Sequence, residues 1–381
     1  MAGDNAGLDR LTTGAAAPAW DRFAHWSAWP ARLLLAAVAA LLVLAAITPL
    51  TASMDGTPAE IPSLVGDSGK APAEERERDE DLAFYDRVIE RIEAGENYYD
   101  FIVEEQRGRN YPVRPGVAVR LPTLAYVHAW LGETGMVVLA FLLMGATVWA
   151  WWKRLGEEPG GEPLRRIGAA FMFMGASLGL NRYYFVLHEL WAGMLVALAF
   201  GLHRPGRWGW SLAVAALALA IREHVLPFVL LMGTMAAWRR DFREAVAWFA
   251  LVLTFLAGMA WHLSLISPQI IPSDPESPDW LVLRGLSGWL GNIVLSSNLR
   301  FLPHEIAGPA VLLMLLGWAG WKSPAGVTGT LLYAGYGLAF ILAGRANNFY
   351  WGAVVAPAMW VGLAFLPMAL ASLLRAARGT R

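Results

Sequence analysis

Two side chains in the first third of the chain have types suited to chemistry, Asp81 and Arg120. Asp81 ends the acidic run Asp79-Glu80-Asp81 at the start of an expected helix. It could act as a general base, or only as a charge that favours the helix N-terminus. Arg120 could hold a ligand phosphate with its planar guanidinium, or extend towards the headgroups of a membrane. The spacing leaves both pairs of interpretations open.

Further polar groups interrupt or flank apolar runs later in the chain. Arg222 and Glu223 fall between two apolar runs, where they could form an internal ion pair or contact a ligand directly. The segment Arg345-Ala346-Asn347-Asn348-Phe349-Tyr350 could donate several hydrogen bonds, or form an ordinary turn. The other candidates open or end apolar runs: His188, Glu189 and His262.

Composition places these residues in a membrane protein. Of the 381 residues, 56% are apolar and 16% are charged, against about 25% charged in a soluble domain. The apolar runs are long enough for a bilayer, which needs about 20 residues per helix. The net charge of −1 gives no field that would attract nucleic acid, and the absence of Cys excludes disulfides and thiolate chemistry.

The apolar runs predict an all-α polytopic membrane protein with about ten transmembrane helices. The expected spans are 31–52, 133–152, 167–183, 185–202, 209–221, 223–238, 244–264, 306–321, 327–343 and 353–374. Lys and Arg concentrate in alternate short loops, which indicates that these loops and both termini are cytoplasmic. The interpretation is a multi-pass plasma (inner) membrane protein whose site faces the periplasm or exterior.

One segment decides the count of spans. Only about thirty residues separate Trp208 from Trp238, whereas two full spans need about 40. A single span would place one of its two basic flanks outside. The charge pattern therefore favours two short helices that meet near mid-membrane at Arg222-Glu223-His224. Charges at that depth are tolerated only beside partners or a wet cavity, so we expect a cavity that opens to the outer face.

Two outer segments are expected to cap this cavity, residues 53–130 and 265–305. In the first, residues 79–94 predict an amphipathic helix ended by Gly95. The second contains a short helical stretch near 280–298. Neither is expected to have a core of its own, so residues 31–381 form one transmembrane catalytic domain. Residues 1–30 form an N-terminal arm in which Trp20, Phe23 and Trp26 either lie in the membrane interface or are disordered.

Motifs of soluble enzymes are missing: there is no Walker A, HExxH or GxSxG pattern with its partners. The His residues are dispersed, so spacing gives no metal site. The acidic clusters of the first outer segment could bind a divalent cation, and no other cofactor is expected.

The order of these pieces resembles the class C (GT-C) membrane glycosyltransferases, in the branch of the lipid A aminoarabinose transferase and the protein O-mannosyltransferases. Asp81 and Tyr85 keep that family's acid-to-Tyr interval, and Gly95-Glu96-Asn97-Tyr98 follows. Arg120-Leu121-Pro122-Thr123-Leu124 is similar to its basic, Pro-containing entry to the second membrane helix, with one Pro missing. Trp261-His262, and then Arg345, Tyr350 and Pro357, match later positions. Leu82 stands where the family often has a second acid, and the chain lacks the extra helices of larger members.

The resemblance implies an inverting transfer of a sugar from a polyprenyl-phosphate donor to a hydroxyl of a glycan or lipid acceptor. Asp81 would be the base, and Arg120, Arg345 and Arg222 would bind the donor phosphate. The remaining implied substrate contacts are Tyr85, Glu96, Tyr98, His188, Glu189, Glu223, His262, Asn348 and Tyr350.

Two other functions fit parts of the sequence. A transporter or flippase of an amphipathic substrate would also use a broken helix and intramembrane charge. However, transporters usually show paired repeats, and the chain has a single break. A scaffold without chemistry would leave Arg222 and Glu223 without a role.

Overall fold

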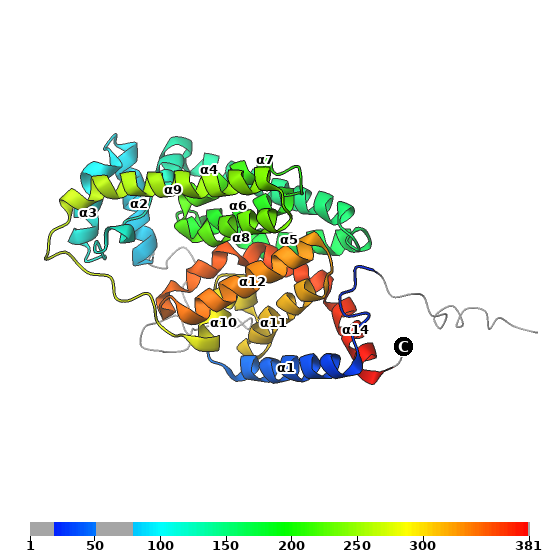
Figure 1. The fold of residues 1–381 in the computed structure, drawn as a ribbon. Coiled ribbons are helices and arrows are strands. Elements are labelled where there is room, and N and C mark those ends of the chain that lie inside the picture. The colour runs from blue at the N-terminus through cyan, green and yellow to red at the C-terminus, as the bar shows by residue number, and fades with distance from the viewer. Residues whose placement is uncertain (1–18, 51–78, 380–381) are drawn as a thin grey trace, which may run out of the picture.

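A computed structural model describes residues 19–50 and 79–379, and within these ranges the chain folds into helices joined by turns. This confirms the all-α class (Figure 1). The α-helices are α1 (Ala28–Ile47), α2 (Glu80–Glu93), α3 (Tyr98–Gly108), α4 (Thr123–Glu157), α5 (Arg165–Ala176), α6 (His188–Leu202), α7 (Gly209–Ile221), α8 (Leu226–Trp238), α9 (Phe242–Ile266), α10 (Gly285–Leu295), α11 (His304–Gly320), α12 (Pro324–Leu342), α13 (Ala356–Met359) and α14 (Leu366–Arg378). Two 3-10 helices matter below, η7 (Glu223–Val225) and η10 (Ala346–Val354).

Several helices are long and apolar enough to cross a membrane. In the described part of the chain these are α1, α4 with its preceding turn, α9 with its last turn, and α12. A fifth span would combine residues Ala356–Ala364 with α14, which are bent by 52°. The expected 133–152 span is the part of α4 that follows a kink at Gly132. The other apolar helices are shorter, so the expectation of about ten spans stays a prediction.

The helices run between two ends of the molecule, here called the cavity end and the closed end. At the closed end, α4, α6 and α9 meet through contacts of Glu157 with Arg204 at 2.6 Å and of His203 with Glu244 at 2.8 Å. At the cavity end, the start of α6 meets the break between α7 and α8, where Glu189 lies 2.6 Å from Arg222. Figure 1 shows the cavity end beside α2 and α3, and the closed end beside α14.

Helix length creates a recess at the cavity end. α7 and α8 have 13 residues each, or about 20 Å, and α9 has 25 residues, or about 38 Å. Because α7 leaves the closed end and α8 returns to it, both stop where the longer α4 and α9 continue. This arrangement agrees with the expected pair of short helices that meet at Arg222.

Basic residues of the connecting loops gather at the closed end, together with the starts of α1 and α12 and the end of α14. They include Lys153, Arg165, Arg166, Arg204, Arg207, Arg239, Arg240, Arg243, Lys322, Arg375 and Arg378. The fold thus brings the alternate basic loops to one end, as the charge pattern predicts.

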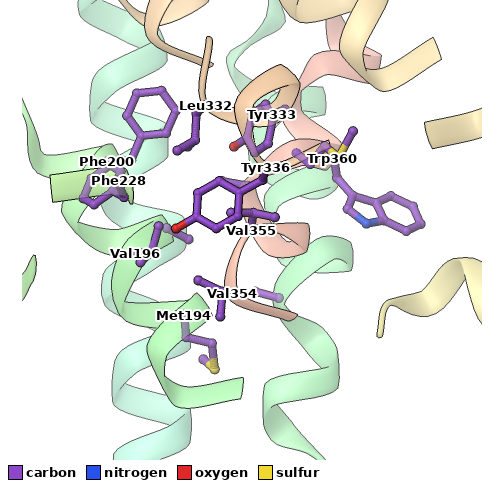
Figure 2. Close-up of a cluster of buried hydrophobic side chains, with 14 of the residues drawn as sticks. Met194, Val196, Phe200, Phe228, Leu332, Tyr333, Tyr336, Val354, Val355 and Trp360 are labelled. Carbon is purple, nitrogen blue, oxygen red and sulfur yellow. The ribbon is translucent and has the colours of Figure 1, made fainter. Parts of the chain in front are cut away.

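The main core packs aromatic side chains against helices that approach closely. Phe200, Phe228, Tyr333 and Trp360 belong to one buried cluster between α6, α8, α12 and the C-terminal helices (Figure 2). A side chain at Gly193 would lie 1.9 Å from the Ala353 carbonyl oxygen, so only glycine lets α6 contact η10. This contact fixes the segment that carries Arg345 and Tyr350 over the recess.

The first outer segment forms a lobe whose hydrophobic cluster also takes in Val186 and Ile266 from outside the segment, so the expectation that it has no core of its own stays untested. α2 matches the expected amphipathic helix, and α3 was not expected. Their apolar faces meet one another and the ends of α4 and α9. Fourteen buried residues make up this cluster: Leu82, Phe84, Val88, Ile89, Ile92, Tyr98, Phe101, Ile102, Val103, Val113, Val119, Ala125, Val186 and Ile266. Residues 51–78 lie outside the described part, so the start of this segment is not included.

The second outer segment divides into a buried helix and an extended strap, residues 272–284. α10 does not cap the cavity as expected. It is mostly apolar, and Leu290, Ile293 and Val294 are buried in the main core. The strap is hydrogen-bonded at both ends. The Ser277 N–H donates to the Arg114 carbonyl at 2.7 Å, and the Gly344 N–H donates to the Trp280 carbonyl at 2.7 Å. It therefore joins the lobe to the end of α12.

The N-terminal residues from Trp20 to Trp26 are packed, which excludes the disordered interpretation of this stretch, and its place in the membrane interface stays a prediction. The Trp20 carbonyl accepts from the Lys322 N–H at 2.8 Å, and Asp21 is buried beside Ser372. Phe23 is buried among α11 and α14. This stretch ties together the closed ends of α11, α12 and α14. Residues 1–18 lie outside the described part.

Candidate functional site

A cavity of about 440 Å³ lies in the recess, between the lobe, the α7–α8 break and η10. Ligand pockets typically enclose about 300–1,000 Å³. The cavity is lined by Asp81, Phe84, Tyr85, Gln106, Tyr111, Pro112, Val117, Ala118, Arg120, Arg222, Glu223, His224, Ser277, Trp280, Ala343, Arg345, Asn347, Asn348, Tyr350 and Trp351. Four segments far apart in sequence thus bring Asp81, Arg120, Arg222 and Arg345 to one space.

Asp81 lies in the first turn of α2 with its side chain exposed to the cavity. The Tyr111 side chain also lines the cavity, near the Asp81 carboxylate. Burial, and then the negative charge of Asp81, raise the pKa of Tyr111, so this hydroxyl stays neutral. Asp79, not Asp81, occupies the N-cap position, and its side chain makes no capping hydrogen bond. The Asp81 carboxylate therefore faces the cavity beside a neutral hydroxyl of its wall.

Arg120 is oriented from two sides. Its Nε donates to the Tyr85 hydroxyl at 2.7 Å, and its Nη1 lies 3.5 Å from the Glu189 carboxylate. Burial raises the pKa of Tyr85 to about 12, against a smaller opposing effect of Arg120. Tyr85 is therefore a neutral partner, and Arg120 keeps positive charge that a ligand anion can use.

Glu189 lies behind the cavity wall and is shared by two arginines. It is fully buried, and Arg222 Nε lies 2.6 Å from one of its oxygens. The contact lacks the alignment of a hydrogen bond, and both Glu189 oxygens are without a hydrogen-bond donor. Arg222 also pairs with Glu223, which contacts His224 Nδ1 at 3.1 Å. The α7–α8 break is thus an ion cluster open on the cavity side.

The third arginine, Arg345, differs in its surroundings. Its backbone N–H and Nε both donate to the Asn348 side-chain oxygen at 3.2 Å, and the Asn348 amide donates to the Tyr350 hydroxyl at 3.2 Å. Among the described residues, no carboxylate lies within ion-pair distance of Arg345, whereas Arg120 has Glu189 and Arg222 has both Glu189 and Glu223. Within the described part of the chain, Arg345 is therefore the cavity arginine with the least compensated charge.

Several buried polar atoms around the cavity lack hydrogen-bond partners. They are His188 Nδ1, both carboxylate oxygens of Glu189, Arg222 Nε and His224 Nδ1. Buried polar groups are normally satisfied, because each unmade bond costs about 1–3 kcal/mol. The concentration of such atoms here indicates a site that water or a ligand completes.

Some predicted site residues do not line the cavity. Glu96 pairs with Arg91 on the exposed side of the lobe, because Gly95, with φ of 92°, turns the chain away after α2. Tyr98 is buried and donates to the Arg120 carbonyl at 2.7 Å. His188 is buried against the Tyr85 ring, with centroids 5.0 Å apart. Tyr98 and His188 support the walls, and none of the three residues lines the cavity.

His262 also supports the site from outside. It is buried, its Nε2 lies 3.1 Å from the Val119 carbonyl oxygen, and its Nδ1 lies 3.1 Å from the Tyr99 hydroxyl. It therefore links α9 to α3 and to the residue that precedes Arg120. The direct ligand contact expected for it is corrected to a structural link.

The cavity residues that the sequence analysis did not predict as site residues include Tyr111, His224, Trp280 and Trp351. His224 was noted only as part of the break. Its ring lies 4.4 Å from that of Trp351 between centroids. Aromatic faces beside guanidinium groups suit a ligand that has both an apolar or sugar face and an anionic group. Tyr111 and Trp280 lie in irregular segments that had no periodic signal.

Metal binding has little support in the described residues, which contain no group of three or more His, Asp or Glu side chains arranged for a metal ion. The acidic run suggested for a divalent cation begins before residue 79 and lies largely outside the described part.

Comparison of the chain with protein families, with curated proteins and with solved structures found no match. The function of the cavity is therefore inferred from its geometry and chemistry.

Proposed function

We propose that the protein is an inverting glycosyltransferase that moves a sugar from a polyprenyl-phosphate carrier to a hydroxyl of a glycan or lipid acceptor. The observation that carries the proposal is the meeting of an exposed carboxylate, Asp81, with three arginines in a single cavity. A base and a phosphate clamp are the two groups that displacement from a sugar phosphate requires.

The roles follow from the contacts. Asp81 takes the proton from the acceptor hydroxyl while its oxygen attacks the anomeric carbon and the bond to the phosphate oxygen breaks. Arg120 and Arg345 bind the departing phosphate, on which negative charge grows. Arg222 adds a third positive charge to the cavity wall. Glu189, which lies between Arg222 and Arg120, holds it in place. His224 and Trp351 form the face on which the sugar rests, because saccharide rings pack well on aromatic side chains.

We infer that the helical body lies in a plasma or inner membrane with the cavity end outside. The basic loops of the closed end supply the cytoplasmic charge. The four long helices set the bilayer thickness, and the shorter apolar helices complete the expected set of about ten spans around the recess. A polyprenyl-phosphate donor would already have its headgroup at this level, so no nucleotide site is needed. The lobe and the strap exclude water, which limits hydrolysis of the donor.

The experiment is a transfer assay with purified protein in lipid nanodiscs, a polyprenyl-phosphate sugar and candidate acceptors. Asp81→Asn should reduce transfer by about 10²–10⁴-fold, the usual contribution of a positioned base, and should leave thermal unfolding unchanged. Asp79→Asn is the matched control. It removes a neighbouring charge from the same helix end outside the cavity, so it should keep transfer. Full activity of Asp81→Asn would exclude Asp81 as the base.

A transporter or flippase remains the second candidate, favoured by the two short helices that meet at a charged break. The packed closed end offers no path in the described structure, which favours access from one side. Vesicle assays separate the two functions. Movement of a labelled lipid-linked sugar across the bilayer without a glycosylated product would support transport and contradict the transferase.

A further inference from the structure

The strap carries an exposed aliphatic run directly beside the cavity. Leu281 is 86% exposed, Leu283 77% and Val282 42%. The residue before this run, Trp280, lines the cavity. Apolar surface and cavity wall therefore follow one another within four residues of extended chain.

The end of α12 continues this apolar surface. The Arg284 N–H donates to the Ile341 carbonyl at 2.8 Å, which holds the strap against the last turn of α12. Leu342 and Leu338 on that helix are about half exposed. Leu281, Val282, Leu283, Leu338 and Leu342 are here called the apolar rim. The strap and the end of α12 thus present exposed apolar side chains close to one another.

The least compensated charge of the cavity adjoins the rim. Arg284 Nη1 donates to the carbonyl oxygen of Arg345 at 2.8 Å, and Gly344, one residue earlier, bonds to Trp280. The two strap residues that flank Leu281–Leu283 thus bond to Arg345 and to its neighbour Gly344. An anionic group at Arg345 would therefore have an aliphatic segment of the strap nearby.

We propose that the apolar rim is the portal for the hydrocarbon chain of a lipid phosphate whose headgroup binds at Arg345. A lipid phosphate fits because Arg345 offers a positive charge for its phosphate. The rim, which continues from the cavity through Trp280, offers an apolar surface for its hydrocarbon chain. A soluble sugar phosphate would use the arginine and leave the leucines unused. The proposal deepens the proposed function, on which it rests for the sugar that the lipid carries.

The experiment compares two donors with one sugar, a long-chain polyprenyl phosphate and a short water-soluble prenyl phosphate. The double variant Leu281→Ser, Leu283→Ser should lower kcat/KM for the long-chain donor about tenfold or more, because two leucine contacts are lost. It should change kcat/KM for the short-chain donor less than about twofold. Arg345→Met should weaken both donors equally, because both have the phosphate.

The matched control is Leu253→Ser, Leu256→Ser on α9, where both side chains are also exposed and lie away from the cavity. This control should keep the activity on both donors. Equal losses on the two donors in the rim variant, or no loss on either, would overturn the portal. Losses in the control that match those of the rim variant would overturn it too, since any exposed leucine would then act in the same way.

Failure of the proposed function has a different signature. If the unmodified protein transfers no sugar from either donor, binding of polyprenyl phosphate itself, measured by native mass spectrometry, tests the portal separately. The rim variant should then lose binding of the long-chain phosphate and keep the weak binding of the short one. Unchanged binding of the long-chain phosphate would overturn the portal.

Discussion

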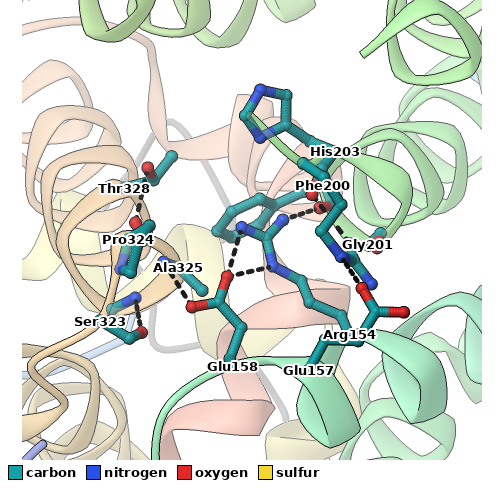
Figure 3. Close-up of polar contacts among 12 residues, drawn as sticks. Arg154, Glu157, Glu158, Phe200, Gly201, His203, Ser323, Pro324, Ala325 and Thr328 are labelled. Carbon is teal, nitrogen blue, oxygen red and sulfur yellow. Dashed lines mark hydrogen bonds and ion pairs between the residues drawn. The ribbon is translucent and has the colours of Figure 1, made fainter. Parts of the chain in front are cut away.

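Buried charges gather at both ends of the helical body, and their hydrogen bonding differs. At the closed end, Arg154 donates to Glu158 at 3.1 Å and to the Phe200 carbonyl, and the second Glu158 oxygen accepts from the Ala325 N–H at 3.5 Å (Figure 3). Beside this group, Glu244 accepts from His203, Arg239 and Trp248. Each of these charged groups has a partner with hydrogen-bond geometry.

At the cavity end, the charges are as numerous but less well satisfied. Glu189 is fully buried, so its charge has lost its hydration. Two arginines lie near it, but neither donates an aligned hydrogen bond to its oxygens. Arg345 faces the cavity with no carboxylate of the described residues within ion-pair distance. A buried network gains stability only when its members are satisfied. The comparison teaches that the closed end is built to hold helices together, and the cavity end to keep charge available for a ligand.

Arg154→Met tests the closed end and should have the largest effect on stability. It leaves Glu158 buried without its charge partner, which typically costs about 3–5 kcal/mol. Thermal or denaturant unfolding in detergent would measure this loss. The sugar-transfer rate of the molecules that remain folded should not change, because Arg154 lies far from the cavity. Normal stability with altered transfer would reverse the assignment of the two ends.

Glu189→Gln tests the cavity end. The amide keeps the shape of the side chain and removes the charge that holds Arg120 and Arg222 in place. We expect kcat for sugar transfer to fall about 10–100-fold, since poorly directed cations stabilise the leaving phosphate less. KM for the donor should not rise, because the cavity gains net positive charge.

The unfolding temperature of Glu189→Gln separates positioning from mere stability. Arg222 keeps Glu223 as a partner, so the loss of stability should be smaller than for Arg154→Met. A large loss of stability with an unchanged kcat of the folded enzyme would mean that the two ends play the same structural role.

The sequence predicted the recess better than it predicted the contacts among the residues that line it. The length of 208–238 and the basic flanks were enough to expect two short helices that meet at Arg222, because both features follow from the bilayer dimension and loop charge. The mostly apolar sequence of 285–295 already favoured a buried helix, because a helix with apolar residues around most of its circumference is usually buried. Its place in an outer segment led to the wrong expectation of a cap.

The partners within the site could not be predicted, because they depend on tertiary contacts. Tyr111 reaches Asp81, and the strap joins Arg345, through irregular chain that has no period. His262 and Tyr98 have residue types suited to ligand binding, and only their bonds to Val119 and Arg120 reveal their supporting role. The sequence identified the three arginines as candidates. It gave no indication of which one has no carboxylate of the described residues within ion-pair distance.

Glu96→Gln has the smallest expected effect and tests whether motif or geometry decides the site. Glu96 follows the helix as the family resemblance requires, yet its carboxylate pairs with Arg91 on the exposed lobe. An exposed pair of this kind contributes at most about 1 kcal/mol, so unfolding should change little. Sugar transfer should stay within about twofold of the unmodified protein, because the change leaves the cavity charges in place. A loss of transfer comparable with that of Glu189→Gln would contradict this prediction, since the lobe would then have to move Glu96 into the cavity during turnover.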